Sequence, residues 1–141
     1  MPLTTHLDIV SGEALIYSGP ATKVVLPAED GEICVLARHA PLLTRLRAGL
    51  VRLANEFEIE QTFFISSGFV EVQPHIVTVL ADTVTRTKDL DEAAARAAME
   101  RTQKAIAAKP AAADYDNLMT ELRMEMALLR AIDQLRRQRK N

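Results

Sequence analysis

The sequence of 141 residues lacks the features that mark several common classes of protein. Its one cysteine, Cys34, excludes an internal disulfide and fits a reducing, cytoplasmic setting. No apolar run approaches the roughly 18 residues that a membrane-spanning helix needs, and the first residues lack the charged-then-apolar pattern of a signal peptide. The formal net charge of −2 gives no reason to expect nucleic acid as a partner.

The motifs of common catalytic and ligand-binding sites are also missing. His6, His39 and His75 show no metal-ligand spacing, and there is no glycine-rich phosphate loop. The stretch Ser66-Ser67-Gly68 lacks the Gly-x-Ser-x-Gly pattern of hydrolases. Cys34 suggests a thiol–imidazole pair with His39, but its strand-like surroundings favour a buried small hydrophobe. We therefore predict no catalytic residues, metal or cofactor, and look for function in surfaces and movement.

The composition changes near residue 86. All five glycines, all four phenylalanines, five of the six prolines and every valine precede that point, and alanine, glutamate, arginine, leucine and methionine follow it. Valine and phenylalanine favour strands, whereas the later residues are strong helix formers. The change predicts two parts, a β domain over residues 1–86 and a helical hairpin over residues 87–141.

Short β-rich runs with turn residues between them recur in the first part. Several strands at a spacing of 8–12 residues indicate an antiparallel β-sandwich or barrel. No segment between them is long enough for a crossover helix, so we do not expect a parallel sheet. The predicted strands cover residues 3–10, 14–17, 22–26, 32–36, 49–54, 59–66, 68–72 and 76–82.

Two helices with opposite directions are predicted in the second part. Asp89 suits the N-cap of the first helix, with Glu92 three residues on, and Pro110 ends it after about residue 108. The second helix is expected over residues 114–138. Its facing stripe would contain Tyr115, Leu118, Leu122, Met126, Leu129 and Ile132. The first helix would offer Leu90, Ala94, Ala97, Ala98, Ala105 and Ile106.

An alanine-rich interface has an energetic consequence. A buried methyl group contributes about 0.8 kcal/mol, against roughly 1.5–3 kcal/mol for a whole leucine or methionine side chain. The docking of the two helices should then be worth a few kcal/mol. A partner that favours the open form by about 5.5 kcal/mol would reverse the equilibrium. The alternative is a tightly packed hairpin that never opens.

Two stretches carry a family resemblance. Gly31-Glu32 and His39-Ala40-Pro41-Leu42-Leu43-Thr44 resemble the epsilon subunit of bacterial F-type ATP synthases. The likeness continues through His6-Leu7-Asp8-Ile9-Val10-Ser11, Ser66-Ser67-Gly68-Phe69-Val70-Glu71-Val72 and Leu90-Asp91-Glu92-Ala93. It extends over nearly the whole chain in order and spacing.

This resemblance implies a ten-stranded β-sandwich followed by a helical hairpin. It also implies a non-catalytic rotor subunit of the proton-translocating enzyme, bound peripherally at the cytoplasmic face of the bacterial inner membrane. The sandwich would contact the gamma subunit and the ring of c subunits. The two helices would extend toward the alpha/beta catalytic head and restrain ATP hydrolysis.

Particular residues follow from the same resemblance. Glu32 is expected against the polar loops of the c ring, although without the resemblance it would be interpreted as a solvated turn carboxylate. An exposed apolar corner would be costly in a monomer and useful at an interface. The predicted c-ring-facing loop comprises Glu32, Arg38, His39, Ala40, Pro41 and Leu42. A predicted basic face for the catalytic head comprises Arg123, Arg130, Arg136 and Arg137, which would otherwise complement the helix dipole.

The family's small ATP motif is incomplete in this sequence. Leu90, Asp91 and Arg101 fit it, but Ala94 stands where the first arginine belongs. Arg96, two residues further on, points about 200° away around a helix. We expect weak ATP binding or none, through Asp91 and Arg101. The alternative function is an ATP-sensing module whose hairpin folds around nucleotide.

Overall fold

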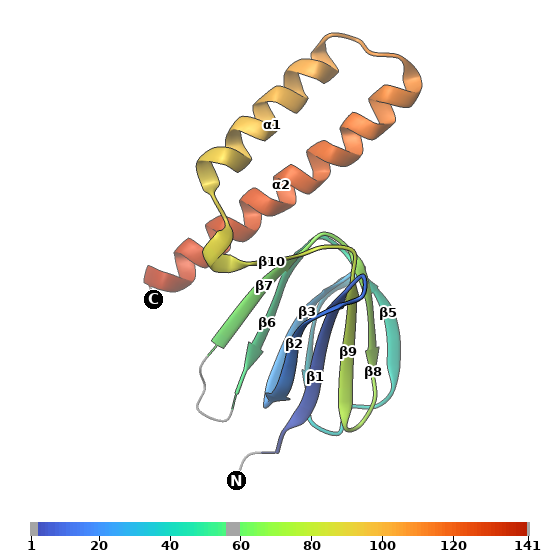
Figure 1. Cartoon of the computed structure of the whole chain (residues 1–141), viewed down its shortest axis with the longest axis vertical. Coiled ribbons are helices and arrows are strands. Elements are labelled where there is room, and N and C mark those ends of the chain that lie inside the picture. Colours follow the sequence, from blue (N-terminus) through green and yellow to red (C-terminus); the bar gives the residue numbers. More distant parts are fainter. Residues whose placement is uncertain (1–2, 56–59, 141) are drawn as a thin grey trace. The chain divides into compact units, whose positions relative to one another are not determined.

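The computed structural model describes residues 3–55 and 60–140, with the backbone alone at residues 139 and 140. The chain forms two compact units, Met1–Lys88 and Asp89–Asn141, and the composition change at residue 86 lies close to this division. The first unit is the predicted β-sandwich and the second is the predicted pair of helices (Figure 1).

Within the described residues of the first unit, ten strands form one continuous sheet. Their order is β10-β7-β6-β3-β5-β8-β9-β1-β2, and β4 pairs with β3 outside this path. The residue patterns predicted eight of them and missed β5 and β10. The strands are β1 (Thr5–Ser11), β2 (Ala14–Ala21), β3 (Lys23–Ala28), β4 (Gly31–Leu36), β5 (Leu42–Leu46), β6 (Gly49–Ala54), β7 (Glu60–Ile65), β8 (Gly68–Val72), β9 (Ile76–Ala81) and β10 (Val84–Arg86). Ile59, the predicted start of one strand, lies outside the described residues.

One pairing departs from the expected antiparallel pattern. β1 and β9 run parallel, from the pair His6 and Ile76 to the pair Ser11 and Ala81. Parallel neighbours need a long connection, usually a helix, and parallel pairing was not expected because no segment between the strands could hold a crossover helix. Here the seven strands between β1 and β9 form that connection, so no crossover helix is required.

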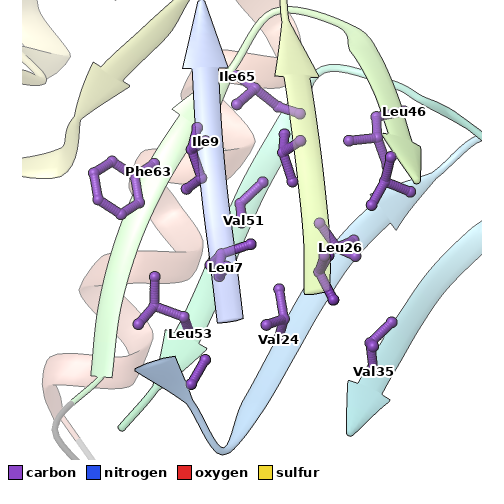
Figure 2. Close-up of a cluster of buried hydrophobic side chains, with 14 of the residues drawn as sticks. Leu7, Ile9, Val24, Leu26, Val35, Leu46, Val51, Leu53, Phe63 and Ile65 are labelled. Atoms are coloured by element: carbon purple, nitrogen blue, oxygen red, sulfur yellow. The ribbon is translucent and has the colours of Figure 1, made fainter. Parts of the chain in front are cut away.

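The core lies between the layers of the sandwich and is filled by alternating positions. In β6, Val51 and Leu53 are buried while Arg52 between them is partly exposed. Because successive strand residues point to opposite faces, alternate side chains of such a strand enter the core. The labelled side chains of Figure 2 converge there: Leu7, Ile9, Val24, Leu26, Val35, Leu46, Val51, Leu53, Phe63 and Ile65.

The first helix of the second unit has its N-cap two residues later than predicted. A 3-10 turn, η1 (Thr87–Asp89), precedes α1 (Glu92–Ala107), and α2 (Ala112–Lys140) follows. The N-cap is Asp91 rather than Asp89, because Asp91 has extended backbone angles and its carboxylate accepts the N–H of Ala94 at 3.2 Å. Asp89 is instead the last residue of the 3-10 turn.

The two helices lie side by side and antiparallel, but α1 presents a different face from the one predicted. Ala95 and Thr102 are buried, whereas Ala94 and Ala97 are exposed. Residues 92, 95, 99, 102 and 106 follow the spacing of three and four that aligns one helical face. The contact is therefore rotated by about one residue, or 100°, from the predicted alanine stripe.

The stripe on α2 was predicted more closely. Leu118, Leu122, Leu129 and Ile132 are half-buried, but Tyr115 and Met126 are exposed. Glu125 is buried in the middle of this face, where no carboxyl group was expected.

Candidate functional site

An exposed apolar row crosses the outer face of the sheet formed by β5, β8, β9, β1 and β2. The register places Phe69 opposite Leu80, Leu80 opposite Val10 and Val10 opposite Leu15. Phe69, Leu80 and Leu15 are 46%, 51% and 59% exposed, and Val10 is partly exposed. We call these four residues the apolar row. They come from four neighbouring strands, so the backbone ladder holds them in one line.

The apolar row continues into a cation at its β5 end. Arg45 is paired with Phe69, and its guanidinium carbon lies 5.7 Å from the centre of that ring. An arginine over an aromatic face is attracted by the ring quadrupole. The aligned apolar side chains remain open to solvent, a costly arrangement that marks protein contact surfaces. The sequence predicted a strand over residues 68–72 but not which of its residues face outward.

A row with more polar character runs beside the apolar row on the same face. Its centre is a hydrogen-bonded cluster in which Ser18 Oγ donates to Asp8 Oδ1 at 2.6 Å, and His6 Nε2 lies 2.8 Å from the same oxygen. The Ser18 hydrogen bond, with a smaller contribution from His6, holds the pKa of Asp8 below its usual 3.8, although partial burial acts in the opposite direction. Five residues on neighbouring strands form this row, each paired in register with the next: Leu43, Glu71, Thr78, Asp8 and Ser18.

The predicted c-ring-facing residues do not form one surface. Glu32 is near the start of β4, where it accepts a hydrogen bond from Arg52 Nη2 at 2.9 Å. Residues 38–42 follow the other end of that strand, and the Arg38 N–H donates to the carbonyl of Pro74. β4 is about 20 Å long at 3.3 Å per residue, so the two groups lie at opposite ends of the sandwich.

The turn at residues 38–42 keeps its predicted exposure. Arg38 has a positive φ of 65°, and Nδ1 of His39 donates to the carbonyl of Ala40 at 2.6 Å. Ala40 and Pro41 are exposed, and Leu42 is 36% exposed at the start of β5. The partner of this apolar corner stays a prediction.

Cys34 corrects one expectation from the sequence. It is exposed rather than buried. Val35 is the residue of this segment that enters the core, and strand alternation turns Cys34 to the outer face.

The predicted ATP residues lie on one side of α1. Asp91, Ala94 and Arg101 share a face by helical spacing, and Ala94 and Arg101 are exposed. The carboxylate of Asp91 already caps the helix. Arg96 lies on another side of the helix, as its position two residues after Ala94 predicted. Its guanidinium pairs with the carboxylate of Glu92 at 2.9 Å.

The predicted basic face is divided between two sides of α2. Arg123, Arg130 and Arg137 recur every seven residues and are exposed, and Arg137 pairs with Asp133 at 3.0 Å. Arg136 forms an ion pair with Glu92 of α1, so it belongs to the helix–helix contact. Arg123, Arg130 and Arg137 therefore lie on one solvent-exposed side of α2.

Two further results concern the parts of the chain that the structure describes. No group of three or more His, Cys, Asp or Glu side chains within residues 3–55 and 60–138 is arranged to hold a metal ion. Neither described helix is long and apolar enough to cross a membrane.

A sandwich with a row of exposed, aligned apolar side chains is typical of a subunit that binds other proteins. The family model described as ATP synthase, Delta/Epsilon chain, beta-sandwich domain matches residues 4–87. The ATP synthase epsilon chain of Alkalilimnicola ehrlichii is 50% identical over 97% of this chain and 98% of that protein. That of Nitrosococcus oceani is 46% identical over the same shares. This chain belongs to the ATP synthase epsilon chain family, which confirms the resemblance found in the sequence.

A solved structure has the same fold. A chain in the cryo-EM structure of the Euglena gracilis mitochondrial ATP synthase aligns with a TM-score of 0.84 at 21% identity, covering 94% of this chain and 83% of that one. The family also confirms that the chain is a non-catalytic subunit of the F-type ATP synthase.

Proposed function

We propose that this subunit holds the gamma subunit and the ring of c subunits together in the central stalk and restrains ATP hydrolysis with its two helices. It would lie peripherally at the cytoplasmic face of the bacterial inner membrane, through the complex alone. The observation that carries the coupling role is the apolar row, because four aligned and exposed apolar side chains need a partner surface.

The apolar row is assigned to the gamma subunit. A rotor contact must transmit torque, and a sheet face fixed by backbone hydrogen bonds on four strands is stiffer than a loop. The neighbouring polar row, centred on Asp8, would give this contact its register through hydrogen bonds.

The sandwich end near Glu32 is assigned to the c ring. Glu32 is about half exposed although it pairs with Arg52, so its carboxylate still has capacity for polar groups of a neighbour. Arg38 and the apolar corner at residues 40–42 lie at the other end and therefore serve a different contact. Charge reversal at Glu32 and at Arg38 should weaken different contacts of the assembled complex.

The helices are assigned to the control of hydrolysis. At 1.5 Å per residue, the 29 residues of α2 span about 43 Å, enough to reach from the stalk into a neighbouring subunit. Arg123, Arg130 and Arg137 supply a cationic side for acidic loops of the catalytic head. Both features support a mechanical stop.

Truncation after Lys88 tests this assignment. The β-sandwich keeps its own core, so the truncated chain should still assemble and support ATP synthesis. ATP hydrolysis by the assembled complex should rise by severalfold relative to the complex with the full chain. A truncated complex that hydrolyses ATP at the parental rate would exclude the restraining role, and failure to assemble would exclude the coupling role of the sandwich.

A further inference from the structure

Glu125 is a buried carboxyl group in the helical hairpin without a hydrogen-bond partner. The residue is 9% exposed, and both carboxyl oxygens are buried. Among the residues that the structure describes, neither oxygen has a partner. Buried carboxyl groups are rare unless they are paired or bind a metal, so this position needs an explanation.

The helical register places Glu125 against α1. Residues 118, 122, 125, 129, 132 and 136 follow one face of α2 at spacings of three and four. Arg136, at the end of this face, forms an ion pair with Glu92 of α1. The face that carries Glu125 is therefore the one that packs on α1, near the middle of the contact.

Two polar side chains of the helix–helix contact, Thr102 and Arg136, have other partners. Thr102, a buried polar residue of α1, donates its hydroxyl to the carbonyl of Ala98 at 3.1 Å. Arg136 is three helical turns from Glu125 and is occupied by Glu92. Burial of a carboxyl group without a partner is unfavourable in either protonation state. The ionised group loses its hydration, and the neutral group loses its hydrogen bonds to water.

We infer that Glu125 weakens the hairpin and keeps α1 and α2 poised to separate. In the closed hairpin its carboxyl group is deprived of solvent, and separation of the helices returns it to water. The helix–helix interface is built from small or half-buried side chains, including Ala95, Met99 and Leu122, so a single uncompensated group changes its stability appreciably. This property belongs to the hairpin itself and does not depend on the proposed restraint of hydrolysis.

Amide hydrogen exchange on the full chain tests the inference. In Glu125→Met, an unbranched apolar side chain of similar length replaces the carboxyl group, and both residues are strong helix formers. The α1 and α2 amides that exchange by helix separation should slow at least tenfold, which corresponds to about 1.4 kcal/mol. Glu125→Gln keeps the shape and removes the ionisable group, so it should slow exchange less than Glu125→Met.

Glu121→Met is the matched control, because Glu121 is exposed one turn earlier in α2. It should leave exchange unchanged. Exchange in Glu125→Met as fast as in the parent, or equal slowing in both methionine variants, would overturn the inference. If exchange slows while hydrolysis by the assembled complex stays the same, the inference holds and the restraining role of the helices is contradicted.

Discussion

The guanidinium carbon of Arg86 lies 5.7 Å from the centre of the Phe63 ring, and Nη2 of the same residue donates to the carbonyl of Ile16 at 3.3 Å. Arg86 is the last residue of β10, and Ile16 belongs to β2. These strands are the two ends of the strand order, so one side chain joins the ends of the ladder. Tyr17 packs on the same ring, with 5.9 Å between the centroids.

Arg86→Ala should lower the free energy of unfolding of the sandwich by about 1–2 kcal/mol, because it removes a cation–π contact and a charged hydrogen bond. Urea denaturation followed by circular dichroism measures the change. Arg86→Lys keeps the charge but loses the planar fork, so its stability should fall between those of the parent and the alanine variant. A stable alanine variant would show that this contact does not hold the ends together.

Gly68→Ala should destabilise the sandwich by more than about 2 kcal/mol. Overpacking typically costs about 1–3 kcal/mol, and here the added methyl group meets backbone atoms, which cannot move aside as a side chain can. An added Cβ would stand 2.2 Å from the carbonyl oxygen of Leu80 and 2.9 Å from the Cα of Ala81. Gly12→Ala is the comparison, since Gly12 has a positive φ of 58° but no atom within 4 Å of the added carbon. It should cost only about 1 kcal/mol for its backbone strain. Equal losses in thermal or urea unfolding would contradict the steric argument.

Asp8→Asn should reduce stability at neutral pH and have less effect in acid. The folded pKa of Asp8 lies below its ordinary 3.8, so the interaction is present above that value and is lost as the pH falls through the lower folded pKa. The difference in free energy of unfolding between parent and variant should therefore shrink below about pH 4. Asp30→Asn, in an exposed turn, serves as the control. A pH-independent difference would contradict this role for the Ser18 and His6 contacts.

Ala94→Arg should tighten the binding of Mg-ATP to the full chain. The exposed Ala94 position shares the side of α1 that carries Arg101, so an arginine there adds a second phosphate-facing cation. Calorimetry should find weak binding or none in the parent and at least severalfold tighter binding in the variant. Gln103→Arg adds a cation at an exposed position nine residues from Ala94, about 180° around the helix, and should have no such effect. Tight binding by the parent would instead favour the ATP-sensing function.

Local composition and motifs predicted much of the fold. The loss of valine, glycine and phenylalanine after Val84 marked the division into two parts, and a resemblance covering nearly the whole chain identified the family. Eight strands were visible as short β-rich runs. β5 was missed because Leu42 to Leu46 follows Pro41 and looked like part of an irregular loop. The parallel β1–β9 pair depends on long-range topology that strand patterns do not contain.

The residues that share an exposed surface were less predictable, because they are brought together by long-range strand pairing and helix packing. Glu32 and Arg38 are close in sequence, but an intervening strand sends them to opposite ends of the sandwich. Phe69 and Leu80 lie far from Leu15 in sequence and become neighbours of one row only through the sheet register. Glu125 looked like an ordinary surface residue, and only the packed helix pair reveals its burial.

The affinity of the chain for the isolated gamma subunit decides whether the apolar row is the rotor contact. Leu80→Asp places a charge in the middle of the apolar row, whereas Leu36→Asp makes the same change at a similar exposure, 55% against 51%, outside that row. We expect Leu80→Asp to bind the gamma subunit at least tenfold more weakly, a loss of about 1.4 kcal/mol or more in binding free energy. Leu36→Asp should bind with the parental affinity. Parental affinity in a correctly folded Leu80→Asp variant would contradict the assignment of this surface to the rotor contact.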